Sequence, residues 1–375
     1  MSSFIGKKLT LSVFGESHGA GVGCVLDGLP AGLPVDTERL QAFLSRRAPG
    51  RSPLSTARRE SDTPVFQSGM LGGFTTGAPL CAFIPNEDPR SQDYAPYADT
   101  PRPGHADYTA GVRYGGHADL RGGGHFSGRL TAALCIAGGI CLQALEAEGI
   151  RIGAHILSVG AGNAKDIPFD PCSPAAQLAL LSEKAGGCAF PVLDDAVGER
   201  MREEILAAKA EGDSLGGVIE CAAAGVPAGL GDPMFDGMEN VLSRLLFSVP
   251  ALRGVSFGDG CESGVLFPFS SRRGSENNDA FLPGNAGDVK TASNHCGGIL
   301  GGITTGMPVL FSCGIKPTPS IAKEQMTVDL RTGDPAKISV GGRHDPCILP
   351  RAVPCVEAAA AVGIFDALLS GKAVR

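Results

Sequence analysis

The sequence predicts an α+β fold in a single domain over residues 1–375, with two related halves at about 8–150 and 205–370. Three observations predict this fold. Strand-like runs alternate with helical segments, two sequence motifs recur in the same order in both halves, and 43% of the 375 residues are apolar, which is enough to bury a large core. We therefore expect a duplicated α+β unit with pseudo-two-fold symmetry.

The expected elements follow from residue type and spacing. Strand-like runs, which are rich in β-branched and other apolar residues, lie at 9–14, 65–70, 152–159 and 309–315. A helix begins after Asp36 or Thr37 as its cap, carries Leu40 and Leu44 on one face, and ends at Pro49. Apolar residues at helical spacing predict further helices over 128–148, 196–211, 235–247 and 351–369.

An internal repeat supports the two halves. G-E-S at Gly15 is followed thirteen residues later by G-L-P-A-G-L at Gly28, and G-D-S at Gly212 is followed at the same spacing by G-V-P-A-G-L at Gly225. Further on, L-G-G-F-T-T-G-A-P-L is repeated as L-G-G-I-T-T-G-M-P-V-L. Chance similarity among glycine-rich turns is the alternative interpretation. If the chain is duplicated, a cleft between the halves is the natural place for a ligand.

Composition excludes several classes of function. A formal charge of −7 argues against non-specific nucleic-acid binding. We expect no signal peptide and no window of membrane-spanning length, and hence a cytoplasmic protein without a membrane partner. The twelve cysteines contain no C-x-x-C pair and are expected to be small buried hydrophobes. No metal-binding pattern is present, and the glycines at 19, 21 and 23 fail the dinucleotide-binding rule.

Cationic residues are concentrated in one part of this acidic chain. Residues 39–59 contain six arginines and no Lys, Asp or Glu. Guanidinium groups bind phosphate and carboxylate in bidentate fashion, so the cluster fits an anionic substrate. Basic residues that end a solvated helix are the alternative, and the sequence leaves both open. The six residues are Arg39, Arg46, Arg47, Arg51, Arg58 and Arg59.

Two histidines and two turns are candidates for proton transfer and phosphate binding. His18 follows a predicted strand and His105 lies beside Gly104, and both fit a cleft position more readily than a purely structural one. K-P-T-P-S at Lys316 offers a cation and hydroxyls for a phosphate, or is an ordinary proline-rich turn. Asp345, next to Arg343 and His344, is either a base or a turn cap.

Taken together, these segments resemble chorismate synthases along nearly the whole chain. The resemblance rests on many long motifs in one order, which is far more specific than any single motif. They are G-E-S-H-G at Gly15, R-R-A-P-G at Arg46, R-S-Q-D-Y at Arg90, R-P-G-H-A-D-Y at Arg102, R-G-G-G at Arg121, G-D-P-x-F-D at Gly231, S-N-H-x-G-G-I-L-G-G at Ser293, K-P-T-P-S at Lys316 and G-R-H-D-P-C at Gly342.

The resemblance implies a fold and a reaction. The fold is a β-α-β sandwich with helices between two antiparallel sheets, assembled as a homotetramer. The reaction is the anti-1,4-elimination of phosphate from 5-enolpyruvylshikimate 3-phosphate to give chorismate, in the shikimate pathway of aromatic amino acid biosynthesis. It involves no net redox change but requires reduced FMN, which lends electron density to the substrate. NADPH is a candidate reductant for the flavin, and the sequence does not decide whether the chain uses it.

The resemblance also implies roles for individual residues. His18 would protonate the departing phosphate, His105 would govern protonation of the reduced flavin, and Asp345 would help it accept the substrate proton. The implied substrate-binding residues are Arg47, Arg46, Arg51 and Arg129. The implied cofactor-binding residues are His125, Phe126, Ser127, Ala251, Gly301, Lys316, Pro317, Thr318, Pro319, Ser320 and Arg343.

Two rival functions remain at this point. A flavin-dependent oxidoreductase would change the oxidation state of its substrate and would use a nicotinamide cofactor, for which the sequence offers no separate fold. A catalytically inactive binding paralogue is suggested by His125-Phe126-Ser127 and Pro250, which differ from the common family pattern of the flavin segment. Retention of His18, His105 and Asp345 argues against the paralogue.

Overall fold

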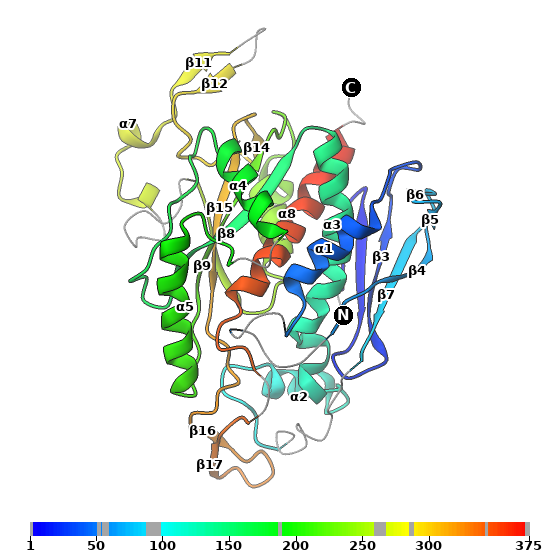
Figure 1. Cartoon of the computed structure of the whole chain (residues 1–375), viewed down its shortest axis with the longest axis vertical. Coiled ribbons are helices and arrows are strands. Elements are labelled where there is room, and N and C mark those ends of the chain that lie inside the picture. The colour runs from blue at the N-terminus through cyan, green and yellow to red at the C-terminus, as the bar shows by residue number, and fades with distance from the viewer. Residues whose placement is uncertain are drawn as a thin grey trace.

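Two antiparallel sheets enclose a layer of helices, so the chain folds as an α+β sandwich (Figure 1). The computed structural model describes residues 3–50, 54, 60–87, 99–186, 190–258, 268–284, 289–341 and 344–371. Helices α1 (Thr37–Arg47), α3 (Thr131–Ala147), α6 (Met238–Leu246) and α8 (Leu349–Gly371) lie between the sheets. The predicted α+β class and the expected helices are confirmed, with boundaries shifted by no more than three residues.

The first sheet packs one face on the helices, and no helix of the described residues covers its other face (Figure 1). Its alternation is clearest in β7, where Leu80, Ala82 and Ile84 are buried while Cys81 and Phe83 point the other way. The strands lie in the order β1 (Phe4–Ile5), β2 (Thr10–Gly15), β3 (Gly21–Asp27), β7 (Leu80–Pro85) and β4 (Val65–Ser68), with a separate hairpin of β5 (Met70–Leu71) and β6 (Phe74–Thr75).

The second sheet is covered on both faces. Helices α4 (Ala175–Ala185) and α5 (Asp195–Ala210) lie on its outer side, where Phe169, Leu178 and Leu310 belong to a second, smaller core. Its strands therefore read as nearly continuous apolar runs. They lie in the order β10 (Leu252–Phe257), β15 (Val309–Ile315), β9 (Gly217–Ala224) and β8 (Arg151–Val159), with a separate hairpin of β13 (Ile299–Leu300) and β14 (Ile303–Thr304).

The central helices α3 and α8 are in close contact. A Cβ at Gly138 would lie 2.3 Å from Ala358 Cα, so the two backbones touch there. Two segments, 128–147 and 349–371, are long and apolar enough to cross a membrane by length and composition. The expectation that no window reaches that length is therefore wrong. Burial inside the protein, 72% and 89% of the two windows, accounts for their apolar character.

The remaining elements connect these layers. Helix α1 begins where Asp36 accepts hydrogen bonds from the amides of Glu38 and Arg39, as the capping signal predicts. The expected burial of cysteines holds for most of those described, seven of ten being buried. The other elements are α2 (Asp107–Tyr114), α7 (Gly274–Asn277), β11 (Phe281–Pro283), β12 (Val289–Thr291), β16 (Gln325–Val328) and β17 (Pro335–Ile338).

The repeated sequence motifs make matching contacts. Thr75 Oγ1 donates to the carbonyl of the loop proline at 2.6 Å and accepts from Leu33 N at 2.9 Å. In the second half, Thr304 Oγ1 makes the same two bonds to its own loop proline and to Leu230 N, at the same 2.6 and 2.9 Å. The two P-A-G turns are therefore held in the same way by the two T-T-G segments.

Candidate active site

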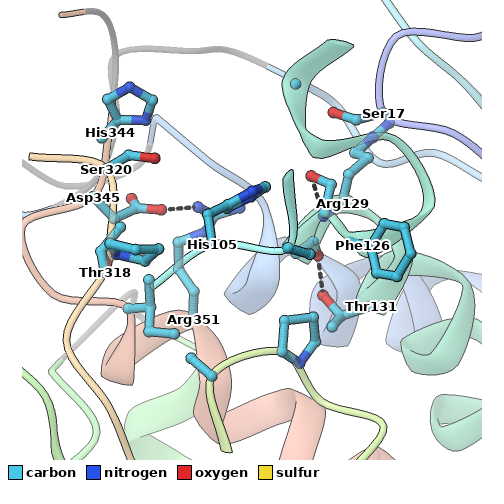
Figure 2. Close-up of a pocket in the computed structure, with 18 of the residues that line it drawn as sticks. Ser17, His105, Phe126, Arg129, Thr131, Thr318, Ser320, His344, Asp345 and Arg351 are labelled. Carbon is cyan, nitrogen blue, oxygen red and sulfur yellow. Dashed lines mark hydrogen bonds and ion pairs between the residues drawn. The ribbon is translucent and has the colours of Figure 1, made fainter. Parts of the chain in front are cut away.

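A cavity of about 580 Å³ lies where α3 and α8 begin and where α1 ends. Turns from both halves of the chain line it, including those that carry His18, His105 and Asp345. Its volume is within the roughly 300–1,000 Å³ typical of small-molecule sites. Figure 2 shows His105, Asp345 and Arg351 on one side and Ser17, Phe126 and Arg129 on the other. The structure thus brings the three predicted catalytic residues into one cavity.

A glycine turn forms the wall that both histidines share. Gly122, Gly123 and Gly124 have φ values of 61°, 87° and 53°, a left-handed conformation that side chains rarely adopt. A Cβ on Gly122 would lie 2.1 Å from the His18 ring, and one on Gly123 would lie 3.3 Å from His105 Nε2. The R-G-G-G motif is therefore the segment whose backbone packs directly against both imidazoles.

His105 is held by a buried ion pair. Its Nδ1 lies 2.6 Å from Asp107 Oδ1, and Asp107 in turn accepts two hydrogen bonds of 2.8 Å from Arg102. Burial opposes ionisation of Asp107, but the bonds from Arg102 and His105 outweigh it and hold the pKa of the carboxyl well below its usual range. An ionised carboxylate only accepts, so Nδ1 carries the proton in its 2.6 Å bond to Asp107; Arg102 Nη2, 3.1 Å from Nδ1, makes the shorter bond of 2.8 Å to the carboxylate. His105 Nε2 then faces the glycine turn at the cavity.

Two arginines meet around Asp62 at the opposite wall. Arg47 is 1% exposed, with its Nη1 3.4 Å from Asp62 Oδ2 and 3.3 Å from the carbonyl oxygen of Arg129. Arg129 also pairs with Asp62, and its Nε donates to Asn86 Oδ1 at 3.0 Å. Desolvation raises the pKa of Asp62, but the two guanidinium charges overcome it and lower that pKa. Within the described chain Arg47 Nε is buried without a hydrogen-bond partner.

Asp345 is positioned by Arg351, which lies in the first turn of α8. Arg351 pairs with the Asp345 carboxylate, and its Nε donates to the Arg47 carbonyl at 2.9 Å. The Arg351 guanidinium thus connects the Asp345 carboxylate to the backbone of Arg47. The neighbouring His344 also lines the cavity, where burial lowers its pKa from the ordinary value. His344 is therefore a neutral imidazole at pH 7.

The K-P-T-P-S segment forms the third wall. Lys316 Nζ donates to the Gly104 carbonyl at 2.9 Å, and Arg102 reaches Ser320 Oγ at 3.2 Å. Thr318 Oγ1 is buried and has no hydrogen-bond partner among the described residues. Ala251, whose carbonyl accepts from Lys316 N, has a left-handed φ of 72°. Strain of this kind in a non-glycine residue is concentrated at functional sites.

His125 and Phe126 line the same cavity, but the nitrogens of His125 are already used. Nδ1 lies 2.8 Å from the Gly15 carbonyl, and Nε2 lies 2.9 Å from Ser3 Oγ. His125 therefore presents a ring face, not a free nitrogen, to a ligand. Phe126, the next residue on the turn, is 37% exposed. Ser127, in contrast, caps the short helix that leads into α3, because its Oγ accepts a hydrogen bond from Arg129 N.

Other predicted site residues lie elsewhere. Arg46 forms a two-bond ion pair with Glu357 on α8, at 2.6 and 2.9 Å, and is absent from the lining of the cavity in the described chain. Gly301 is in the turn of the β13–β14 hairpin and is likewise absent from that lining. Pro317 lies between two lining residues. Arg51 and Arg343 fall outside the described residues.

Several residues of the site were not predicted from the sequence. Arg102, Asp107 and Arg351 hold the candidate catalytic groups, and Asp62 joins the two arginines. A signal for Asp107 exists, because it follows His105 by two residues within the R-P-G-H-A-D-Y motif. Asp62 and Arg351 offer no comparable signal, since their partners come from distant parts of the chain.

The donor set fits a flavin cofactor. The unsatisfied Thr318 hydroxyl, the Lys316 ammonium and the Ser320 hydroxyl lie on one segment, as a phosphate tail or the polar edge of a ring system requires. His125 and Phe126 line the cavity, and their aromatic rings suit contact with a flat ring system. On the other side of the cavity, Arg47 contributes a guanidinium cation and His18 an imidazole, which suit an anionic group.

Comparison with known proteins agrees with this geometry. The family model described as chorismate synthase matches residues 9–369. The chorismate synthase of Lancefieldella parvula is 45% identical over 99% of this chain and 97% of its own length. That of Thermococcus gammatolerans is 46% identical over 98% of both. A crystal structure of chorismate synthase superposes with a TM-score of 0.75 at 28% identity, covering 98% of this chain and 93% of that one.

Proposed function

Because the chain belongs to the chorismate synthase family, we propose that the cavity between its two halves is the active site of that reaction. The activity is that of a chorismate synthase, a carbon–oxygen lyase of the shikimate pathway that eliminates phosphate from 5-enolpyruvylshikimate 3-phosphate. One observation carries the assignment of the site. His18, His105 and Asp345 come from three separate segments and line the same cavity.

The wall formed by Arg47 and Arg129 is the phosphate side of the proposed site. A departing phosphate dianion needs positive charge and a proton, and Arg47 Nε has a hydrogen-bonding position left over. His18 is 8% exposed and backed by Gly122, so its ring is fixed where it can donate a proton to a phosphate oxygen. Arg46 is assigned a structural role instead, because Glu357 occupies its guanidinium.

His105 and Asp345 form the proton-handling side. Asp107 keeps the proton of His105 on Nδ1, which leaves Nε2 to accept or return a proton at the cavity. Asp345 is a carboxylate held by Arg351, so it can take up a proton without moving away from the site. Binding energy from the fixed guanidinium groups orients the substrate between these two sides.

Reduced FMN is the proposed cofactor, and when bound it would supply electron density to the substrate. Lys316, Thr318 and Ser320 are the residues proposed to hold its polar groups, with the ring faces of His125 and Phe126 against the flat system. NADPH stays an open candidate as the reductant.

We also infer that the fold is a pseudo-two-fold duplication. The strand order β2-β3-β7-β4 is matched by β8-β9-β15-β10, the hairpin β5–β6 by β13–β14, and α1 and α3 by α6 and α8. The identical contacts of Thr75 and Thr304 support the match. In this alignment the second half begins at β8, near residue 151 and not near 205, because α4 and α5 are inserted after its first strand.

A homotetramer and a cytoplasmic location are part of the same proposal. The uncovered face of the first sheet carries Phe14 and Phe83, whose rings stack at 6.5 Å, and the exposed Val65 beside them on β4. Exposed apolar faces of this kind mark contact surfaces between proteins. With a formal charge of −7, neither nucleic acid nor an anionic membrane surface is a proposed partner.

The test is an anaerobic incubation of the chain with reduced FMN and 5-enolpyruvylshikimate 3-phosphate. Phosphate and chorismate should appear together in equal amounts, without net oxidation of the flavin. Net consumption of NADPH with an oxidised product would favour the oxidoreductase. Absence of both products from a folded, flavin-loaded protein would favour the inactive paralogue.

A further inference from the structure

Two cysteines meet at the floor of the cavity, where α3 and α8 come together. Cys135 Sγ lies 3.9 Å from Cys355 Sγ, and Cys355 is one of the cavity-lining residues. One helical turn further along, Gly138 and Ala358 bring the two backbones into contact. Both pairs are separated by the same 220 residues, so the sulfurs lie in register with that contact. The tight helix crossing therefore fixes the two thiols side by side.

The two thiols differ in their surroundings. The hydrogen bond from Cys135 and a second one from Thr131, together with the charges of Arg47 and Arg351, lower the pKa of Cys355 to about 7 despite its burial. Burial, in contrast, raises the pKa of Cys135 well above its ordinary value. Of the two sulfurs, that of Cys355 belongs to the cavity lining and can meet a small oxidant there, whereas Cys135 lies behind it.

We propose that Cys355 and Cys135 form a peroxide-reactive dithiol at the floor of the cavity, oxidised by hydrogen peroxide to a disulfide that joins α3 to α8. The Cys355 thiolate attacks one peroxide oxygen, the O–O bond breaks, and hydroxide leaves; Cys355 becomes a sulfenic acid. Cys135 then loses its proton and attacks the Cys355 sulfur, the S–O bond breaks, and water leaves. Two thiols and one peroxide thus give one disulfide and two waters.

Another cysteine pair in the chain serves as a contrast. Cys24 on β3 and Cys81 on β7 come from neighbouring strands, but Cys24 is paired in register with Ala82, and Cys81 with Val25. Their side chains therefore point to opposite faces of the first sheet, and a disulfide cannot join them. Cys172 is exposed and is the matched control for simple accessibility. At Cys135 and Cys355, in contrast, the two sulfurs are in contact and one of them lines the cavity.

The experiment treats the purified full-length chain with a few equivalents of hydrogen peroxide, blocks the remaining thiols, and maps the peptides by mass spectrometry. The expected product is one cross-linked pair of peptides carrying Cys135 and Cys355, lighter by two hydrogens and restored by dithiothreitol. Cys24 and Cys81 should stay blocked as free thiols. Failure to find the cross-link, or its appearance only in denaturant, would overturn the proposal.

Two variants separate the roles of the sulfurs. In Cys135→Ala, dimedone should trap a sulfenic acid on Cys355, because the resolving thiol is missing. In Cys355→Ala, modification of Cys135 should be at least about tenfold slower, since that thiol is protonated and shielded. Cys172→Ala should leave the cross-link unchanged. Equal labelling of Cys135 and Cys355 in the two variants contradicts the assignment even if a disulfide forms.

Discussion

Replacing Asp107 by Asn tests whether the carboxylate acts through His105. Asp107 lies 2.6 Å from His105 Nδ1 and is 4% exposed, so the bond is short and shielded from water. A hydrogen bond to a charged group contributes about 1.5–3 kcal/mol, and each ~1.4 kcal/mol corresponds to about tenfold in rate. The asparagine amide also favours the wrong imidazole tautomer. We therefore expect kcat to fall by about 10- to 100-fold, with KM nearly unchanged.

The assay is steady-state chorismate formation under anaerobic conditions with saturating reduced FMN. Thermal unfolding should accompany it, because Arg102 loses a charged partner in the same variant. Glu324→Gln is the matched control, since it removes an exposed carboxylate that pairs with Lys337 at 2.7 Å away from the cavity. This control should leave kcat and KM unchanged.

A double-mutant cycle tests whether Asp107 acts on kcat through His105. In a His105→Ala background, Asp107→Asn should have almost no further effect on kcat, because residues that act as a unit are not additive. If Asp107→Asn lowers kcat by the same factor in both backgrounds, the carboxylate does not act through the imidazole, and the reasoning fails.

Three further predictions concern one glycine of the cavity wall and two buried ion-pair networks. Gly122→Ala should lower kcat at least about tenfold, because its Cβ would lie 2.1 Å from the His18 ring; Gly149→Ala, with a left-handed φ but open space, is the control in the same assay. Arg46→Ala should lower the free energy of unfolding in urea by about 3 kcal/mol by leaving Glu357 unpaired, while KM of the folded enzyme stays unchanged. His155 lies between the carboxylates of Asp166 and Glu220. Burial opposes its positive charge, but the two carboxylates outweigh burial and raise the pKa of His155 in the folded state. Its contribution to the free energy of unfolding is therefore complete below the ordinary histidine pKa and is lost as pH rises through the raised pKa of the folded state. Unfolding measured from pH 5 to 9 should show this decline in the parent and a flatter profile in His155→Gln; parallel profiles would contradict it.

Much of the fold was predictable from residue pattern. The expected strands at 9–14, 152–159 and 309–315 and the helices after Asp36 and at 351–369 all form, because alternation and helical spacing are local properties. The helix at 196–211 was expected from its spacing, but its place beside α4 on the outer face of the second sheet was not predicted. That place depends on the packing of the whole chain and not on local sequence.

The turns that form the candidate site were predictable from the sequence, but the residues that pair with its side chains were not. G-E-S-H-G, R-P-G-H-A-D-Y and R-G-G-G mark segments where backbone approaches a side chain, and the structure brings all three to one cavity. Asp62 and Arg351 escaped prediction, because an isolated Asp or Arg has no local signal. Cys135 and Cys355 were expected only to be buried, and their contact depends on a helix crossing that joins residues 220 positions apart.

Arg46 and Arg47 show what cannot be predicted from the sequence alone. The amino-acid sequence determined that two adjacent guanidinium groups end a helix in an acidic chain, together with the motifs of a family that binds a phosphorylated substrate. The tertiary structure alone decided that Arg47 lines the cavity, while Arg46 binds Glu357 from 311 residues away. Consecutive residues on a helix point about 100° apart, so neighbours of the same type face different surroundings, and only the packed fold defines those surroundings.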